Sequence, residues 1–138
     1  MKNPIPQGKY IPAKKSNGII ISAGMTPRLD GVLVKTGKVK LNDDINAYKK
    51  AAIQAAKNAI TAVINTLEGG ESLEAIISLA VYVNAEEGFT SHSKIADFAS
   101  EYLVDEFGEL AISPRAAIGV SSLPSDAPLE IQIIATYI

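Results

Sequence analysis

The sequence predicts an α+β fold, a two-layer sandwich in which two helices cover one face of a six-stranded mixed sheet. Short β-branched runs recur along the chain, and two longer segments carry apolar residues at helical spacing. The elements follow in the order β-β-β-α-β-α-β-β. At 138 residues the chain is long enough to bury a core, so residues 1–138 are expected to form one domain.

The first half should contain three strands and a helix. Strands are predicted over residues 10–16 and 18–23, joined by the two-residue hairpin signal Asn17-Gly18, with a short edge strand over 32–39. The first helix should be capped by Asn42 and end at Gly69-Gly70. An alanine-rich stripe at helical spacing would let this helix approach the sheet closely, and it consists of Ile45, Tyr48, Ala52, Ala55, Ala56, Ala59, Val63 and Leu67.

The second half should add a central strand, a helix and two closing strands. The central strand is predicted over residues 73–83, and the helix runs from a cap at Thr90 or Ser91 to a stop at Gly108. The closing strands are predicted over 115–121 and 129–138. One face of the last strand, with Glu130, Gln132, Ile134 and Thr136, is neither fully polar nor covered by a helix. Such a face is a natural subunit interface.

Composition narrows the classes of function. The net charge of −2 and the lack of a basic stretch argue against nucleic acid as the main partner. No cysteine is present, which excludes disulfides and thiol catalysis and fits a reducing compartment. No apolar run is long enough to span a membrane and the start has no signal-peptide pattern, so a soluble cytoplasmic protein is expected. The only histidine, His92, has no neighbouring cysteine or carboxylate pair; a surface or capping role is expected, with no metal and no cofactor.

Two charged residues at the ends of apolar strands are the first candidates for function. Arg115 begins one closing strand and Glu130 lies near the start of the next. Burying either charge is costly unless it is paired or used. A guanidinium can hold a carboxylate through two parallel N–H bonds, and a glutamate can orient or deprotonate a water. The alternative is that the two residues form a structural salt bridge with each other.

The sequence around these residues resembles the Rid family (YjgF-type, L-PSP endoribonuclease-like). The resemblance covers nearly the whole chain. The segments that carry it are Ser113-Pro114-Arg115-Ala116-Ala117, Leu129-Glu130-Ile131, Gly8-Lys9-Tyr10-Ile11-Pro12-Ala13, Ile21-Ser22-Ala23-Gly24-Met25-Thr26-Pro27 and Val81-Tyr82-Val83-Asn84. It implies a chorismate-mutase-like fold of the bacillus type and a homotrimer with ligand clefts between subunits. It also implies a cofactor-free deaminase that hydrolyses small 2-imino acids to 2-oxo acids and ammonia.

The resemblance also implies roles for individual residues. Arg115 would hold the substrate carboxylate and Glu130 would manage the water. Gly24 would shape the floor of the cleft, or simply end a strand, and Tyr10 would line the cleft, or simply sit at a strand edge. Ser93 is the nearest match to an asparagine that the family often has at the second helix.

The chain departs from the family pattern at three positions near the expected cleft. The family often has cysteine where this chain has Ala117, and Ala23 and Met25 replace polar residues. The pocket should therefore be less polar, as in a divergent branch. This leaves two alternatives to the deaminase: a non-catalytic trimer that binds a small carboxylate, and an endoribonuclease or translation inhibitor. The net negative charge and the lack of clustered aromatic and basic residues argue against RNA as the substrate.

Overall fold

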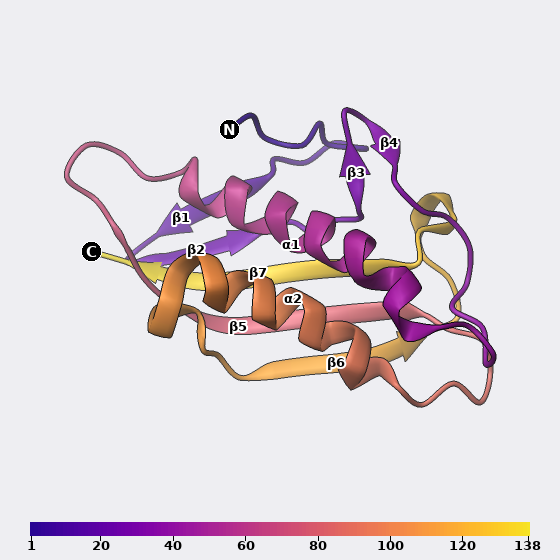
Figure 1. The fold of residues 1–138 in the computed structure, drawn as a ribbon. Helices are drawn as coiled ribbons and strands as arrows, with labels where there is room; N and C mark the ends of the chain where they lie inside the picture. Colours follow the sequence, from indigo (N-terminus) through magenta and orange to yellow (C-terminus); the bar gives the residue numbers. More distant parts are fainter.

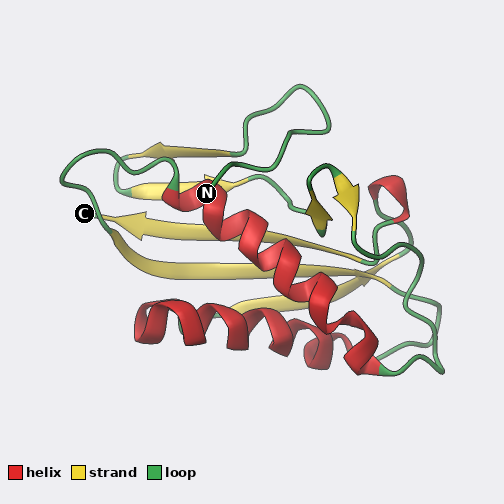
Figure 2. Ribbon diagram, turned by 45° about the horizontal axis from the view of Figure 1, so that its top comes forward, coloured by secondary structure: helices red, strands yellow, loops and turns green.

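The structure, a computed structural model, describes residues 1–138. Two helices pack against one face of a five-stranded sheet whose strand order is β1-β2-β7-β5-β6 (Figures 1 and 2). The elements are β1 (Ala13–Ser16), β2 (Ile19–Ser22), β3 (Arg28–Leu29), β4 (Val32–Leu33), α1 (Lys49–Ile64), β5 (Leu73–Asn84), α2 (His92–Phe107), β6 (Arg115–Val120) and β7 (Leu129–Tyr137), with short 3-10 turns at Ile45–Tyr48, Gly108–Ala111 and Pro124–Asp126. The predicted α+β class is confirmed.

The sheet is mostly antiparallel. β1 and β2 form the predicted hairpin around Asn17 and Gly18, whose φ angles of 49° and 83° suit a tight two-residue turn. β7 pairs with β2 on one side and with β5 on the other, both antiparallel. β5 and β6 are parallel, and α2 makes the connection between them. The last strand of the chain therefore lies at the centre of the sheet, and β6 is an edge strand.

The expected sixth strand is absent from this sheet, so the predicted strand count was wrong. Within the range 32–39, only Val32–Leu33 is a strand, and it pairs with β3 in a separate two-stranded ribbon. Gly37 then turns the chain with a φ of 99°, a value that a continuous strand does not accommodate. Beyond this turn, Val39 makes a single parallel bridge to Ala85.

The observed ends of α2 match the predicted ends, whereas those of α1 differ from the prediction. Ser91 precedes α2 and Gly108 ends it with a φ of 72°, as predicted. Asp44 caps the 3-10 turn Ile45–Tyr48 that leads into α1, and it accepts a hydrogen bond from the Asn46 amide at 3.0 Å; the predicted cap Asn42 lies earlier, and α1 itself has no side-chain cap. α1 ends at Ile64, before Gly69-Gly70, because the Thr66 hydroxyl and local turns supply partners to its last carbonyls.

The core lies between the helices and the central strands. Small side chains on the inner face of α1 are almost fully buried: Ala51, Ala52, Ala55, Ala56, Ala59 and Ala62. They pack with Leu129, Ile131, Ile133 and Ala135 of β7, all 0% exposed. The predicted alanine stripe is confirmed. Alanine allows close helix–sheet approach, which favours the dense packing of a stable core.

The opposite face of the sheet has no helix over it. Glu130, Gln132, Ile134 and Thr136 lie on this open face half-buried, as their alternation with the core residues predicts. Large apolar side chains also remain accessible there, including Ile21, which pairs with Ile134 and is 45% exposed.

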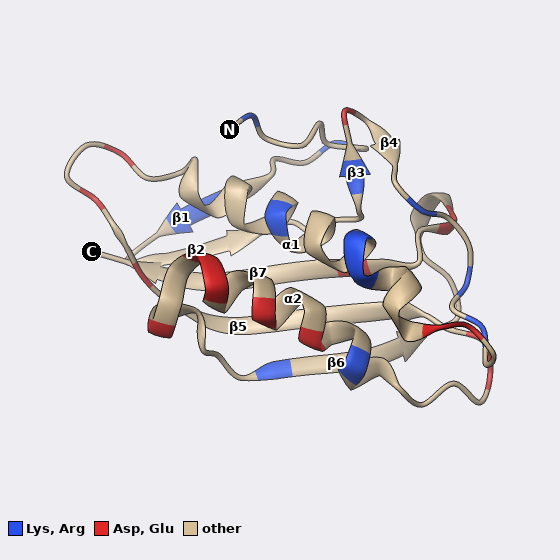
Figure 3. Cartoon of the chain, in the orientation of Figure 1, with Lys and Arg blue, Asp and Glu red and all other residues tan.

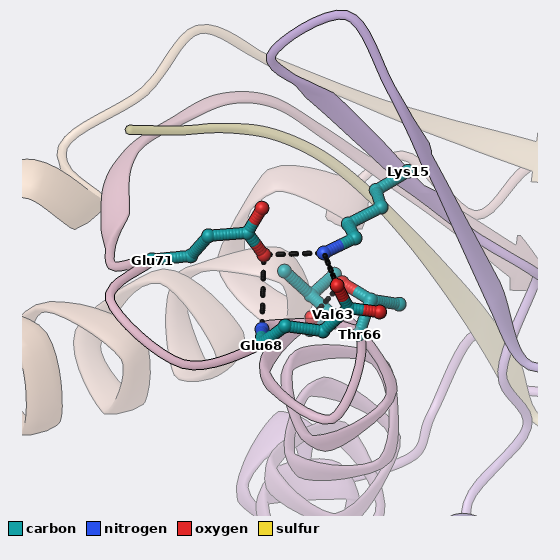
Figure 4. A network of polar contacts seen from close by, with 5 residues as sticks. All are labelled: Lys15, Val63, Thr66, Glu68 and Glu71. Carbon is teal, nitrogen blue, oxygen red and sulfur yellow. Dashed lines mark hydrogen bonds and ion pairs between the residues drawn. The ribbon is translucent and has the colours of Figure 1, made fainter.

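An ion network attaches the first strand to the turn after α1. The Lys15 amine of β1 bonds the Glu71 carboxylate and lies 3.6 Å from Glu68 (Figure 4). Glu71 also accepts a bond from the Glu68 amide at 2.9 Å. The Lys15 bond lowers the pKa of Glu71, and the same bond raises the pKa of Lys15. The network holds the edge of the sheet against the helical layer.

Candidate functional site

Arg115 lies at the start of the edge strand β6 and its side chain extends to α2. Nη1 donates to Asp97 Oδ1 at 2.8 Å and to Ser100 Oγ at 3.0 Å. Nη2 donates to Ser93 Oγ at 2.7 Å and to the Ser93 carbonyl at 3.2 Å. In Figure 3 the blue start of β6 faces acidic positions on α2. The helix therefore fixes the guanidinium at the edge of the molecule.

These contacts decide how Arg115 could hold a ligand. Four of the five guanidinium N–H groups are used within the chain, and the Nε–H has no bond. The Asp97 side chain is 54% exposed and the Arg115 side chain 19%. An incoming carboxylate can bind the Nε edge with two bonds only if it replaces Ser93 or Asp97 as the acceptor of one Nη–H group. Ser93 and Asp97 are both exposed, so a ligand can reach this position from solvent.

Glu130 lies in a different environment. It sits on β7 opposite Tyr82 of β5, on the open face, and no hydrogen bond or ion pair engages its carboxylate. Burial raises its pKa. The carboxylate leans over Gly24, where a Cβ atom would lie 2.3 Å from Glu130 Oε2. Glycine at this position leaves room for the carboxylate, because a Cβ atom there would overlap it.

One chain does not bring Arg115 and Glu130 together. β5 lies between their strands, so the expectation of adjacent strands was wrong. The two residues also face opposite sides of the sheet. Arg115 is in register with Leu79, which faces the helices, whereas Glu130 is in register with Tyr82 on the open face. The alternative of a salt bridge between them is also excluded within one chain.

Of the other predicted site residues, Ser93 and Ala117 lie beside Arg115, and Tyr10 lies apart from both charged residues. Ser93 contacts Arg115 directly, and Ala117 follows Arg115 on the same face of β6, packed against the core. Tyr10 lies in the segment before β1, 46% exposed, with its hydroxyl accepting a bond from the Gln7 amide at 3.1 Å. Within one chain Tyr10 bonds neither Arg115 nor Glu130.

Sequence reasoning missed Asp97 and Ser100. With Ser93 they follow a spacing of four and three residues, which places all three on one face of α2. That spacing was readable from the sequence. The partner of this face was not, because nothing in the chain order says that α2 lies beside β6 at this register.

His92 was expected in a surface or capping role, yet it packs against β6. Its Nε2 lies 2.5 Å from where a Cβ of Gly119 would be, so the imidazole sits directly on the glycine. Phe89 packs edge-on against the ring at 5.1 Å. Both His92 and Gly119 line an open pocket of about 620 Å³. A second pocket, near the N-terminal segment and the β3–β4 ribbon, encloses about 520 Å³ and is not lined by Arg115.

Two further observations concern the whole chain. No group of three or more histidine, cysteine or acidic side chains is arranged to hold a metal ion. No helix is long and apolar enough to cross a membrane.

Comparison with known proteins identifies the family. The family model described as endoribonuclease L-PSP matches residues 1–137. The chain belongs to this family. A RutC family protein of Aquifex aeolicus is 29% identical over 135 residues, covering 97% of this chain and 93% of the relative. The resemblance to the Rid, YjgF-type proteins is thereby confirmed.

Solved structures agree on the fold. A candidate endoribonuclease from Shewanella oneidensis has a TM-score of 0.89 at 22% identity, covering 99% of this chain and 90% of its own. Escherichia coli TdcF, solved with bound serine, has a TM-score of 0.69 at 21% identity, covering 97% of this chain and 92% of its own. At these identities the structures bear on the fold alone.

Proposed function

We propose that the protein is a cofactor-free deaminase that hydrolyses small 2-imino acids to 2-oxo acids and ammonia. The observation that carries the proposal is the guanidinium of Arg115, fixed by α2 at an exposed sheet edge with its Nε–H unbonded. A 2-imino acid presents a carboxylate next to an electrophilic carbon. Arginine holds such a group in a defined orientation, which is the main requirement for a reaction with a modest barrier.

The second group required is a carboxylate that handles water. Glu130 is unpaired and its pKa is raised by burial, so it is a better base than an ordinary surface glutamate. Because it faces away from Arg115 within one chain, the complete site would combine Arg115 of one copy with Glu130 of another. The open apolar face around Ile21 and Ile134 and the free edge of β6 would form the contact. A cyclic homotrimer, as the resemblance implies, would close such contacts.

The resemblance to the Rid family is what implies a small 2-imino acid as the ligand. TdcF, which shares the fold at 21% identity, was solved with bound serine. Serine, like a 2-imino acid, carries nitrogen on the carbon next to a carboxylate. Ribonuclease names also occur among relatives. The net charge of −2 provides little attraction for RNA, so we rank that activity lower.

The test measures hydrolysis of 2-iminopropanoate and 2-iminobutanoate generated in situ by an amino-acid oxidase. The purified protein should accelerate loss of the imine, and Arg115→Met should remove the acceleration. Lys50→Met, which removes an exposed cation of α1 away from the site, is the matched control and should leave the rate unchanged. No acceleration with either imine would refute the proposal.

A second candidate is a binding protein without turnover. The apolar positions Ala23, Met25 and Ala117 favour it, because they remove polar groups that could assist chemistry. Calorimetry with pyruvate and 2-oxobutanoate separates the two functions. Binding that depends on Arg115 without imine turnover would identify a binding protein.

A further inference from the structure

A pocket of about 520 Å³ lies where the N-terminal segment and the turn of the β3–β4 ribbon meet one side of α1 (Figure 1). It is here called the α1 pocket. Most of the residues that line it are polar or charged, and they include three cations, Lys2, Arg28 and Lys57, against one acid, Asp30. The chain as a whole carries a net charge of −2, so this excess of positive charge is local. A pocket of this size and charge is suited to a small anionic ligand.

The helical wall of the α1 pocket is a stripe of polar side chains, which three- and four-residue spacing places on one face of α1. The stripe consists of Gln54, Lys57, Asn58 and Thr61. Asn58 is 8% exposed and fixes the helix to the start of β3, because its amide donates to the Thr26 carbonyl at 3.1 Å and to the Arg28 carbonyl at 2.8 Å. Thr61 is 7% exposed, and its hydroxyl has no hydrogen-bond partner within the chain. This buried hydroxyl on the pocket wall is therefore available to a ligand.

The ribbon wall contributes Arg28, whose guanidinium is only partly used within the chain. Nη1 donates to the Gly31 carbonyl at 2.8 Å and so closes the two-residue turn Asp30-Gly31, whose φ angles are 53° and 83°. The Nε–H is buried and has no partner within the chain. Closing the turn needs one donor only, and buried N–H groups are normally bonded to protein, water or a ligand. Arg28 therefore has more donors on this wall than its structural role requires.

The other two cations reach the α1 pocket from separate elements. Lys57 is half-buried on α1 and Lys2 is exposed on the N-terminal segment, and neither forms an ion pair within the chain. The N-terminal segment is held at the end of α1, where the Asn65 amide donates to the Met1 carbonyl at 2.7 Å and to Asn3 Oδ1 at 2.9 Å. Positive charge thus enters the pocket from the ribbon, the helix and the N-terminal segment.

We propose that the α1 pocket binds a small phosphate monoester, whose phosphate group accepts hydrogen bonds from Arg28, Lys57 and the Thr61 hydroxyl. A phosphate monoester has acceptor oxygens in several directions and a charge of about −1.5 to −2 at pH 7, which suits donors from separate walls. A carboxylate has its two oxygens in one plane and suits a single guanidinium. The organic part of the ligand would cover Ile5 and Leu29, which line the pocket and are 70% and 54% exposed. The site does not rest on the proposed function.

The experiment titrates the purified protein with glycerol 3-phosphate and with inorganic phosphate by calorimetry, at constant ionic strength. Lys57→Met should weaken binding of both by about 10- to 100-fold, because a charge-assisted bond is lost. Thr61→Val, which keeps the shape of the side chain, should weaken it by about 2- to 10-fold. Lys50→Met, which removes an exposed cation of α1 outside the pocket, is the matched control and should leave the affinity within about twofold. No binding of either compound at about 10 mM, or equal affinities for the wild type and Lys57→Met, would overturn the inference.

Further variants separate the α1 pocket from the Arg115 site. Arg115 does not line the pocket, so Arg115→Met should bind glycerol 3-phosphate as the wild type does, and Lys57→Met should retain imine hydrolysis. Asp30→Asn keeps a residue type that tolerates a positive φ and removes the one acid, so it should bind about 1.5- to 5-fold more tightly. Binding that is lost in Arg115→Met and kept in Lys57→Met would assign the anion to Arg115 and overturn the inference. Single-stranded RNA that binds more tightly than glycerol 3-phosphate and depends on Lys57 would also overturn it, because the pocket would then hold a polymer backbone.

Discussion

The Asp97 carboxylate competes directly with any carboxylate ligand for Arg115. It lies 2.8 Å from Nη1, and it is more than half exposed. Asp97→Asn should free this donor from a charged partner while keeping a side chain of similar shape. An exposed ion pair of this kind contributes about 0.2–1 kcal/mol, which corresponds to about 1.5- to 5-fold in a dissociation constant. We therefore expect pyruvate to bind about 1.5- to 5-fold more tightly to Asp97→Asn.

The assay is isothermal titration calorimetry with pyruvate at low ionic strength, where screening is weak. Arg115→Met is the reference, and should lose at least about 3 kcal/mol of binding, or about 100-fold, because two charge-assisted bonds disappear. In the Arg115→Met background, Asp97→Asn should have no further effect. A tenfold loss of affinity in Asp97→Asn alone would refute the reasoning, because it would mean that Asp97 positions the guanidinium more than it competes for it.

Three further predictions concern stability. Glu130→Gln should raise Tm at pH 7 and not at pH 4. Burial raises the pKa of Glu130, so ionisation of this carboxyl destabilises the folded protein as pH rises through that pKa. A lower Tm for the variant at pH 7 would contradict this. Ile131→Ala should reduce the free energy of unfolding by about 2–5 kcal/mol, since the side chain is 0% exposed, whereas Ile112→Ala at 69% exposure should change it by less than about 0.5 kcal/mol; urea denaturation that gives equal losses would contradict the described core. Lys15→Met should lower Tm at pH 7 and have little effect at pH 3, because the lowered pKa of Glu71 gives stability that is lost as pH falls through it; a pH-independent loss would point to packing by the lysine stem.

Much of the fold was predictable because it depends on local patterns. The alternation of buried and open residues in 129–138 and the glycine stop at Gly108 are set by strand and helix periodicity, and both are confirmed. The sixth strand was wrong because Gly37 breaks a run that is apolar enough for a strand. The end of α1 was wrong because local turn bonds after Ile64 compete with continued helix.

The individual site residues could be predicted from the sequence, but their arrangement in space could not. The types and spacing of Arg115 and Glu130 pointed to carboxylate and water chemistry, but strand order is not local information. β5 enters the sheet between their strands, and the register of the two strands with β5 places the residues on opposite faces. The contact between His92 and Gly119 could not be predicted either. The two residues are 27 positions apart, at the start of a helix and near the end of a strand, and the parallel pairing of β5 with β6 brings them together.

A site that uses Arg115 of one copy and Glu130 of another requires that two inactive variants complement each other within one oligomer. The direct measurement co-expresses Arg115→Met and Glu130→Gln chains with different tags and assays imine hydrolysis by oligomers purified through both tags. In a mixed cyclic trimer one site of three regains both residues, so activity of about one third of wild type is predicted although each variant alone is inactive. Mixed oligomers as inactive as the separate variants would contradict the shared site.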